Sequence, residues 1–316
     1  MLSYINLPEN ALLAVSGGGD SVGLAWMYRL RNLPASIGHV RHGKSEWQLT
    51  SEKFVRELSD ELHYPFFSKT ISTQSRGGQG FEAKSRRLRY AALVELALHF
   101  SLDTLVTAHT RDDFAETVAI AIHRKQGIAA LKGIPEQRVL HQIGETKIDV
   151  ARPLLQVTRE ALREEMRREK ISWLDDPTND DPAYALRNSI RSEWAKLSPT
   201  AYEAKLQEME AIALDAKSRW LNAESLISIS LPEWNEPLGE QLSFPSSRLL
   251  QFTDDALQVL FSKVAKNFGV ESGSIPQGHR KQFASILLHS KWGSRGMLGS
   301  QLKYRLTKQE CRFSRL

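Results

Sequence analysis

Short apolar segments alternate regularly with helical patterns through the first half of this chain. The apolar segments are typical of buried strands, and the segments between them repeat apolar residues at the spacing of a helix. We expect the strands at residues 11–15, 35–40, 65–71 and 103–109, and the helices at residues 21–30, 45–64, 81–100 and 112–124. Because parallel strands need a crossover that is usually a helix, this order predicts an α/β fold with a doubly wound parallel sheet.

The alternation ends after Gly127. Residues 134–155 have the pattern of a short hairpin and its exit, and residues 158–170 that of a helix with Thr158 as its N-cap. Residues 200–225 follow with the pattern of a long helix. A helix of that length at this point is suited to connect two domains.

The length of 316 residues and the hydrophobic content of 41% also favour two domains. The last segment, residues 299–316, alternates in the way that edge strands do. We therefore expect an α/β domain at 1–198, a connecting helix at 199–225 and a smaller domain, mainly helical or mixed, at 226–316.

The composition excludes several classes of protein. No apolar run approaches the roughly 20 residues of a membrane span, and the N-terminus has no secretion-signal pattern, so we expect a cytoplasmic protein without a membrane partner. A single cysteine, Cys311, can form neither an internal disulfide nor a cysteine metal cluster. The net charge of +5 suits a phosphate-rich partner without demanding one.

A glycine-rich loop joins the first expected strand to the first expected helix. It consists of Ser16, Gly17, Gly18, Gly19, Asp20 and Ser21. Backbone N–H groups in such a loop, together with the helix N-terminus, form a site for phosphate, and serine hydroxyls can add hydrogen bonds. The alternative is a tight turn in which Asp20 or Ser21 caps the helix. No lysine follows the glycines, so the loop is not a Walker A motif.

Acidic residues follow the fourth expected strand, where ligands bind in open α/β sheets. Asp112 and Asp113 lie four and three residues before Glu116, so these carboxylates share one helix face. They could bind an ammonium group, hold Mg²⁺ or accept a proton. The alternative is that they only favour the first turn of the helix. His109, just before them, is either a core residue or a ligand contact.

Two groups of arginines are candidates for phosphate binding. Arg86 and Arg89 share a helix face, whereas Arg87 beside them has the features of a solvated surface residue. Arg187 and Arg191 would form one basic edge on a helix. For this second pair the alternative is a surface ion pair with Asp180 or Asp181, and for residues 72–80 the glycine-rich sequence favours an exposed loop.

The glycine loop resembles the S-G-G-x-D-S loop of the PP-loop ATP pyrophosphatases, in which it holds the pyrophosphate of ATP. Further motifs resemble those of the tRNA(Ile)-lysidine synthetase family and occur in the same order, strongly over residues 11–191. They are HVRHG, RRLRYAAL, TAHTRDDFAETVAIAIHRKQG, RPLLQVTREAL, WLDDPTN and RNSIR. The resemblance implies a PP-loop fold.

The resemblance also implies an activity. ATP would adenylate the wobble cytidine of an isoleucine tRNA with a CAU anticodon, and L-lysine would then attack C2 to give lysidine, AMP and pyrophosphate. The implied cofactors are ATP and Mg²⁺, and the implied tRNA-binding domain is 226–316. The sequence assigns no metal ligands and leaves the oligomeric state open, with a homodimer as one option.

Roles follow for the residues that match the family motifs. The catalytic set is Asp113, Glu116 and Arg89, the cofactor-binding set is the glycine loop Ser16–Ser21, and the substrate-binding set is Arg86, His109, Asp112, Arg187 and Arg191. In this assignment the two acids seat the lysine ammonium and receive its proton, which must leave before the amine can attack.

Several positions depart from the family pattern. Arg41 replaces an aspartate and would bring a cation near the nucleotide, Phe114 replaces a glutamine, Ala121 replaces an arginine, and residues 124–127 reduce an R-G-x-G motif. These changes keep two alternatives open: a nucleotide- or RNA-binding module without turnover, and another adenylating amide ligase. A thiolase is disfavoured because it needs more cysteine than this chain has.

Overall fold

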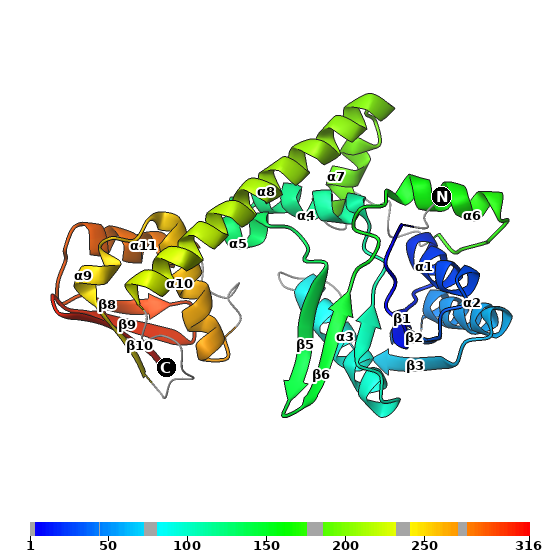
Figure 1. Ribbon diagram of the computed structural model, residues 1–316, viewed down its shortest axis with the longest axis horizontal. Coiled ribbons are helices and arrows are strands. Elements are labelled where there is room, and N and C mark those ends of the chain that lie inside the picture. The colour runs from blue at the N-terminus through cyan, green and yellow to red at the C-terminus, as the bar shows by residue number, and fades with distance from the viewer. Residues whose placement is uncertain (1–3, 44, 73–80, 176–185, 232–240, 271–276) are drawn as a thin grey trace. The chain divides into compact units, whose positions relative to one another are not determined.

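The computed structural model describes residues 4–43, 45–72, 81–175, 186–231, 241–270 and 277–316 (Figure 1). Most of the loop expected at 72–80, together with Asp180 and Asp181, lies outside the described residues. The chain divides into two compact units. The N-terminal unit comprises Met1–Glu116 and Ile134–Tyr202, and the C-terminal unit comprises Thr117–Gly133 and Glu203–Leu316.

In its described part, the N-terminal unit contains a six-stranded sheet in the order β3-β2-β1-β4-β6-β5. The strands are β1 (Ala11–Ala14), β2 (Ala35–His42), β3 (Phe66–Ile71), β4 (Thr104–Val106), β5 (Gln137–Ile143) and β6 (Thr146–Ala151). All neighbours pair in parallel except β5, which pairs antiparallel with β6 at the edge. The predicted parallel sheet and hairpin are confirmed.

Helices cover both faces of this sheet. Successive side chains of a strand point to opposite faces, so neighbouring residues of β1 pack into different core clusters. Leu13 of β1 packs into one core cluster, together with residues of the helices α1 (Gly19–Leu30), α2 (Glu46–Leu62) and α6 (Arg159–Arg168). Leu12, its neighbour, packs into the other cluster with residues of α3 (Phe81–His99). The doubly wound α/β class is therefore confirmed.

The strand order places a switch point between β1 and β4. From β1 the chain adds β2 and then β3 on one side, and it later adds β4 on the other side of β1. Crossovers that leave in opposite directions open a crevice at the carboxyl ends of these two strands. The glycine loop follows β1 and the acidic segment follows β4, so both lie at this crevice.

Further helices continue from the N-terminal unit. They are α4 (Arg111–His123), α5 (Ile128–Leu131), α7 (Leu186–Trp194) and α8 (Pro199–Ser230). The boundary between the units falls within α4 and again within α8. From the sequence, each domain is expected to be one continuous segment. In the structure, residues 117–133 instead group with the C-terminal unit, because Ile128 belongs to the core of that unit.

In the described residues, the C-terminal unit has an antiparallel sheet in the order β7-β10-β9-β8, with helices on one face. Its elements are β7 (Gln241–Pro245), α9 (Ser246–Leu249), α10 (Asp254–Asn267), α11 (Gln277–Leu288), β8 (Arg295–Leu298), β9 (Leu302–Leu306) and β10 (Glu310–Arg315). The prediction that residues 299–316 form edge strands is wrong, since β9 and β10 are the two inner strands. Their alternation arises because one face of the sheet packs on the core and the other faces solvent.

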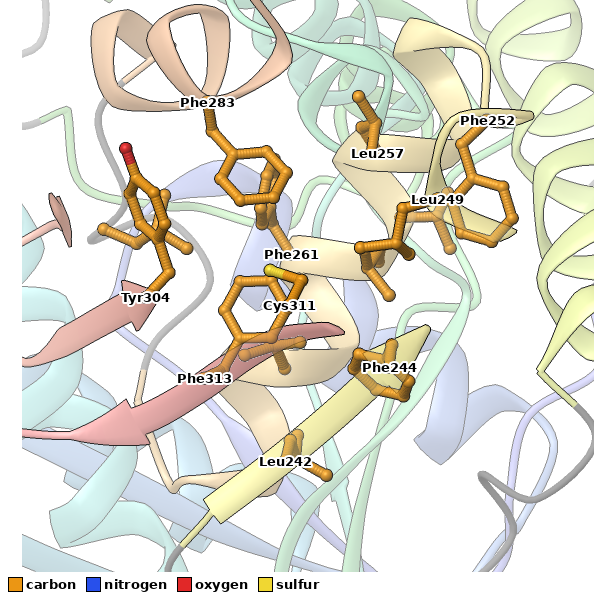
Figure 2. Packing of buried hydrophobic residues seen from close by; sticks show 14 of the residues in the cluster. Leu242, Phe244, Leu249, Phe252, Leu257, Phe261, Phe283, Tyr304, Cys311 and Phe313 are labelled. Atoms are coloured by element: carbon orange, nitrogen blue, oxygen red, sulfur yellow. The ribbon is translucent and has the colours of Figure 1, made fainter. Parts of the chain in front are cut away.

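The core of the C-terminal unit is rich in aromatic side chains (Figure 2). Phe261 of α10 and Phe283 of α11 lie edge to face, with ring centroids 5.1 Å apart. Phe313 of β10 and Tyr304 of β9 complete the cluster from the sheet. No described helix is both long and apolar enough to cross a membrane.

Gly23 allows α1 to pack closely against α6. A Cβ at this position would lie 2.9 Å from Leu162 Cγ and from Met166 Sδ, which is shorter than side-chain contacts allow. We expect Gly23→Ala to lower the free energy of unfolding by about 1–3 kcal/mol, the usual cost of overpacking. Urea unfolding followed by tryptophan fluorescence measures this change.

Gly278→Ala is the matched control, because a Cβ on Gly278 meets nothing within 4 Å. We expect it to change the free energy of unfolding by less than about 0.5 kcal/mol. Equal stabilities for both variants would show that α1 and α6 are not packed this tightly.

Candidate active site

A cavity of about 890 Å³ opens at the switch point of the N-terminal sheet. Its walls include the residues that follow β1 and β4, backbone near Gly38 and Val40 of β2, and side chains of α6 and α7. Its lining includes apolar groups such as Leu93 and Trp194 as well as charged groups. The cavity therefore offers both an apolar surface and a strongly polar one.

The glycine loop forms one wall of this cavity. Gly17 has a φ of +97°, in the region that favours glycine, and it is not itself a lining residue. It packs against Val55 and against Leu174, which lines the cavity. Gly18, Gly19 and the first turn of α1 do line the cavity. Gly17 thus shapes the loop, while the residues after it face the cavity.

Side chains do not cap α1 in the described structure. The hydroxyl of Ser21 donates to Gly18 O at 2.8 Å, and the backbone N–H of Ser16 donates to Ser21 Oγ at 3.1 Å. Ser21 therefore braces the loop, and the alternative in which Asp20 or Ser21 serves only as an N-cap is not what the structure contains. A helix N-terminus without a side-chain cap keeps the positive end of its dipole available to an anion.

The acidic pair also lines the cavity. Asp113 and Glu116 are both buried and both line the cavity. Asp113 Oδ2 accepts hydrogen bonds from the N–H and hydroxyl of Thr110, and Thr110 Oγ1 accepts from Asp113 N–H, which is a capping box. The local sequence T-R-D-D therefore fixes one carboxylate oxygen and leaves Asp113 Oδ1 facing the cavity.

Asp112 is hydrogen-bonded within the protein through both of its carboxylate oxygens. Its Oδ2 accepts from the backbone N–H of Arg159 at 2.7 Å, and its Oδ1 accepts from the hydroxyl of Tyr202. It is not among the residues that line the cavity. Both of its oxygens thus contact α6 and the start of α8, and its predicted contact with substrate stays a prediction.

Among the described residues, three arginines contact the acidic pair. Arg191 reaches Glu116 Oε1 at 2.7 Å and Asp113 Oδ1 at 3.0 Å, and Arg187 lies 3.7 Å from Asp113 and 3.8 Å from Glu116. Arg159 reaches Asp113 at 3.2 Å and Glu116 at 3.3 Å. The sequence predicts that Arg187 and Arg191 bind phosphate or form a surface ion pair. In the structure they form ion pairs with Asp113 and Glu116.

Arg159 also contacts the glycine loop, through Asp20 Oδ2 at 3.3 Å. One guanidinium therefore joins the loop after β1 to the acids after β4. Arg159 lies within the motif RPLLQVTREAL but is not among the residues predicted from the sequence. Its position directly after the N-cap Thr158 was the available signal, because the first turn of a helix near the crevice points toward ligands.

Arg163, one turn further along α6, lines the cavity as well. Its Nε is buried and has no hydrogen-bond partner among the described residues. It lies 3.5 Å from where a Cβ of Gly19 would be, beside the N-terminus of α1. Arg163 was also missed from the sequence, and its charge is available to an anion held by the glycine loop.

The protonation states of the site follow from these contacts. Burial alone would raise the pKa of Asp113, but Arg159, His109, the backbone of Thr110 and Arg191 outweigh it and hold the pKa at about 2. Burial lowers the pKa of His109 to about 3 despite Asp113 nearby. At neutral pH the carboxylate is therefore charged and the imidazole is neutral.

The remaining predicted residues divide between the cavity and its surroundings. Arg89 and His109 line it, whereas Arg86 lies outside the lining set, with its guanidinium 5.6 Å from the ring centre of Tyr90. Tyr90 lines the cavity, and Arg152 donates to its hydroxyl at 3.5 Å. Arg86 therefore contacts a residue that lines the cavity, and its predicted direct contact with substrate stays a prediction.

The positions that depart from the family pattern also lie off the cavity lining. Arg41 pairs with Glu52 at 3.2 Å and donates to Thr70 Oγ1 at 2.8 Å, so it does not bring the expected cation to the cavity. Phe114 and Ala121 are buried and are not lining residues. These departures change the packing around the site and leave its charged walls intact.

The low pKa of His109 makes the stability of the fold depend on pH. The unfolded chain binds a proton at this residue below about pH 6.5, whereas the folded chain does so only near pH 3, so the free energy of unfolding falls as the pH drops between these values. We expect His109→Asn to weaken this decline, measured as urea midpoints at pH 7, 5.5 and 4.5. His63→Asn, at an exposed position with positive φ that asparagine tolerates, is the control, and parallel profiles for all three proteins would contradict the effect.

Comparison with known proteins places this geometry in a family. A relative from Thermus thermophilus, called tRNA(Ile)-lysidine synthase, is 40% identical over 58% of this chain and 35% of its own length. Relatives of the same name from Ruegeria pomeroyi and Zymomonas mobilis are 32% and 30% identical, over 65% and 67% of this chain and 48% and 64% of theirs. The chain thus spans about one to two thirds of the length of these relatives. The PP-loop domain family matches residues 5–198, and this chain belongs to it.

Proposed function

We propose that this protein ligates L-lysine to C2 of the wobble cytidine of an isoleucine tRNA with a CAU anticodon. The reaction consumes ATP, passes through an adenylated cytidine and yields lysidine, AMP and pyrophosphate. One observation carries the proposal: a single guanidinium, Arg159, touches both the glycine loop and the acidic pair. A phosphate held by the loop and an amine held by the acids would therefore be neighbours. The names of the relatives agree with this chemistry.

The glycine loop would bind the phosphates of ATP. The dipole of α1 and the guanidinium of Arg163 offset negative charge there, and the cationic lining exceeds the acidic lining. The cationic side chains are Arg89, Arg159, Arg163, Arg187, Arg191 and Lys196, and the acidic ones are Asp20, Asp113, Glu116 and Asp175. A polyanion fits this balance better than a free amine does.

Mg²⁺ fits beside Asp20. The Oδ1 atom of Asp20 is buried and has no hydrogen-bond partner among the described residues. Mg²⁺ in proteins is commonly held by one or two carboxylates together with phosphate oxygens. Burial raises the pKa of Asp20, which is the effect expected of a carboxylate that lacks enough counter-charge. When bound, the ion would offset charge on the phosphates.

The acidic pair would seat the lysine ammonium. With a pKa of about 2, the Asp113 carboxylate is a weak base, so in the present arrangement it is suited to bind the cation and not to take its proton. Its proton affinity rises once a guanidinium moves away, because the arginines are what lower the pKa. Movement of the arginines would therefore both vacate the site and strengthen the base.

The alternatives lose support from the structure. Arg41, the main reason to expect a module without turnover, lies off the cavity lining and is paired with Glu52. The thiol of Cys311, needed by a thiolase, is buried in the core of the C-terminal unit.

The substrates also fit the proposed cytoplasmic location, since free lysine, ATP and tRNA all occur there.

Incorporation of lysine into tRNA is the direct test. The protein is incubated with an isoleucine tRNA transcript carrying a CAU anticodon, Mg·ATP and radiolabelled lysine, and we expect label in the tRNA and release of pyrophosphate. Asp113→Asn removes the charge that holds the ammonium and should lower the rate by about a hundredfold or more, the scale of losing one key electrostatic group.

Glu160→Gln, an exposed change on α6, is the control and should retain the parent rate. Lysine-dependent pyrophosphate release without tRNA would instead identify an amide ligase. Tight ATP binding with no incorporation would identify a binding module.

The arginines around the acids also predict an order of binding. Lysine and the arginines compete for the same carboxylates, and phosphate groups of ATP would attract those arginines. We expect calorimetry to show lysine binding at least tenfold tighter in the presence of a non-hydrolysable ATP analogue than in its absence.

Arg191→Gln should raise the affinity of the nucleotide-free protein for lysine, because it removes one competing cation. Arg168→Gln, which breaks an ion pair with Glu165 at a half-exposed arginine on α6, should have no effect on lysine binding. Equal lysine affinity with and without nucleotide in the parent protein would refute this order.

A further inference from the structure

The peptide unit that leads from β1 into the glycine loop is held at both of its ends. Its carbonyl group belongs to Val15 and accepts a hydrogen bond from the side chain of His39 at 2.8 Å. Its N–H belongs to Ser16 and donates to Ser21 Oγ at 3.1 Å. Because a peptide unit is planar, two such hydrogen bonds fix the direction of the whole group. We call this arrangement the entry clamp.

The entry clamp lies where the pairing of β1 with β2 ends. These strands pair in parallel up to Ala14 and Gly38, and the N–H of Val15 still donates to the carbonyl of Gly38 at 3.0 Å. The next bond of a parallel ladder would run from the N–H of Val40 to the carbonyl of Val15, and these two described residues do not form it. The imidazole of His39 occupies this acceptor instead. The strands therefore part at this point, where Val15 and Val40 line the cavity.

The contact with Val15 also defines which nitrogen of His39 carries hydrogen. A carbonyl oxygen only accepts, so Nδ1 is the donor and the neutral ring has the Nδ1–H tautomer. The other nitrogen, Nε2, is buried and has no hydrogen-bond partner among the described residues, and the ring lies near that of Phe66. A hydrogen on Nε2 would be a buried donor without an acceptor, which is costly. Burial accordingly lowers the pKa of His39, although the bond to Val15 opposes this shift.

His39 lies behind the glycine loop and not in the cavity. Gly38 and Val40 line the cavity, and because side chains alternate along a strand, His39 points to the other face of the sheet. Its side chain is buried, and it is not a lining residue. His39 can therefore act on a bound ligand only through the backbone of the loop.

The hydrogen bonds that hold the loop leave part of its backbone available to a ligand. The carbonyl of Gly17 accepts from the N–H of Leu174 at 3.0 Å, so the loop is held a second time from the segment after α6. The N–H groups of Gly19 and Asp20 form no hydrogen bond with any described residue, and both residues line the cavity. An anion bound there would meet N–H groups whose direction follows from how the loop is held.

We propose that His39 is a positioning residue of the nucleotide site, an inference that rests on the proposed function. The Nδ1–H of His39 fixes the entry clamp, and the clamp directs the N–H groups of the loop toward the phosphates of ATP. The alternative is a histidine that only fills the core beside Phe66. The two roles have different requirements, because positioning depends on a donor at the place of Nδ1, whereas filling the core depends on volume.

The test compares His39→Asn with His39→Gln in the full chain. The amide nitrogen of asparagine can occupy the place of Nδ1, whereas that of glutamine lies at the place of Nε2. Calorimetry with Mg²⁺ and a non-hydrolysable ATP analogue should show affinity at least about tenfold lower in His39→Gln, the scale of one lost hydrogen bond. In His39→Asn the affinity should stay within about threefold of the parent. Equal affinities for His39→Gln and the parent would overturn the proposal.

The tautomer provides a second readout, which does not depend on catalysis. NMR of the protein labelled with ¹⁵N-histidine should show, near neutral pH, a neutral ring with hydrogen on Nδ1 whose signals are absent from His39→Asn. Hydrogen on Nε2, or a charged ring, would overturn the proposal even if the variants did not fold.

Leu62→Ala is the control for a loss of stability. Leu62 is buried in the core of the N-terminal unit, at the last position of α2. Its truncation should lower the free energy of unfolding and leave the affinity for the ATP analogue unchanged. An equal loss of affinity in Leu62→Ala and His39→Gln would show that instability alone explains the effect, and the positioning role would be wrong.

Lysine incorporation, measured in parallel, separates this inference from the proposed function. A parent that binds the ATP analogue in a manner dependent on His39 but incorporates no lysine would overturn the proposed function alone. An active parent whose His39→Gln variant keeps the parent's KM for ATP would overturn the inference alone.

Discussion

The guanidinium of Arg159 is the contact on which the organisation of the cavity depends. It lies within 3.3 Å of carboxylates from two segments, the first turn of α1 after β1 and helix α4 after β4. Because β1 and β4 flank the switch point, a side chain that bridges them fixes the width of the crevice. Asp112 fixes Arg159 in turn by accepting a hydrogen bond from its backbone. Among the charged groups around Asp113, Arg159 does most to hold the pKa of that carboxyl low.

The arginines around Asp113 and Glu116 give the site two possible states. In the state described here, guanidinium groups satisfy the acids, and the low pKa of Asp113 makes it a poor base. An anionic nucleotide and a cationic amine would redistribute these ion pairs, since each substrate attracts one of the two partners. The same side chains can thus hold the site together and exchange partners when an anionic nucleotide and a cationic amine bind.

Much of the fold could be predicted from the sequence, because strand and helix patterns are local. The alternation of apolar and helical segments was enough to predict the strands that begin near residues 11, 35 and 65. It was also enough to predict that the sheet is parallel. The position of β9 and β10 did not, since an alternating strand with one solvated face looks the same at the edge and in the middle of a sheet. The grouping of residues 117–133 with the C-terminal unit depends on core contacts with residues far along the chain.

The sequence by itself determined that a glycine loop and two acids meet at one crevice, because both follow parallel strands whose carboxyl ends lie together. Only the tertiary structure decided which cations meet those acids, that Arg41 turns to Glu52, and that His39 holds the carbonyl of Val15. The physical reason is that ion pairs and strand register join residues far apart in the chain. The partners in these ion pairs and strand pairs are set by helix packing and strand order, and local periodicity in the sequence does not indicate them.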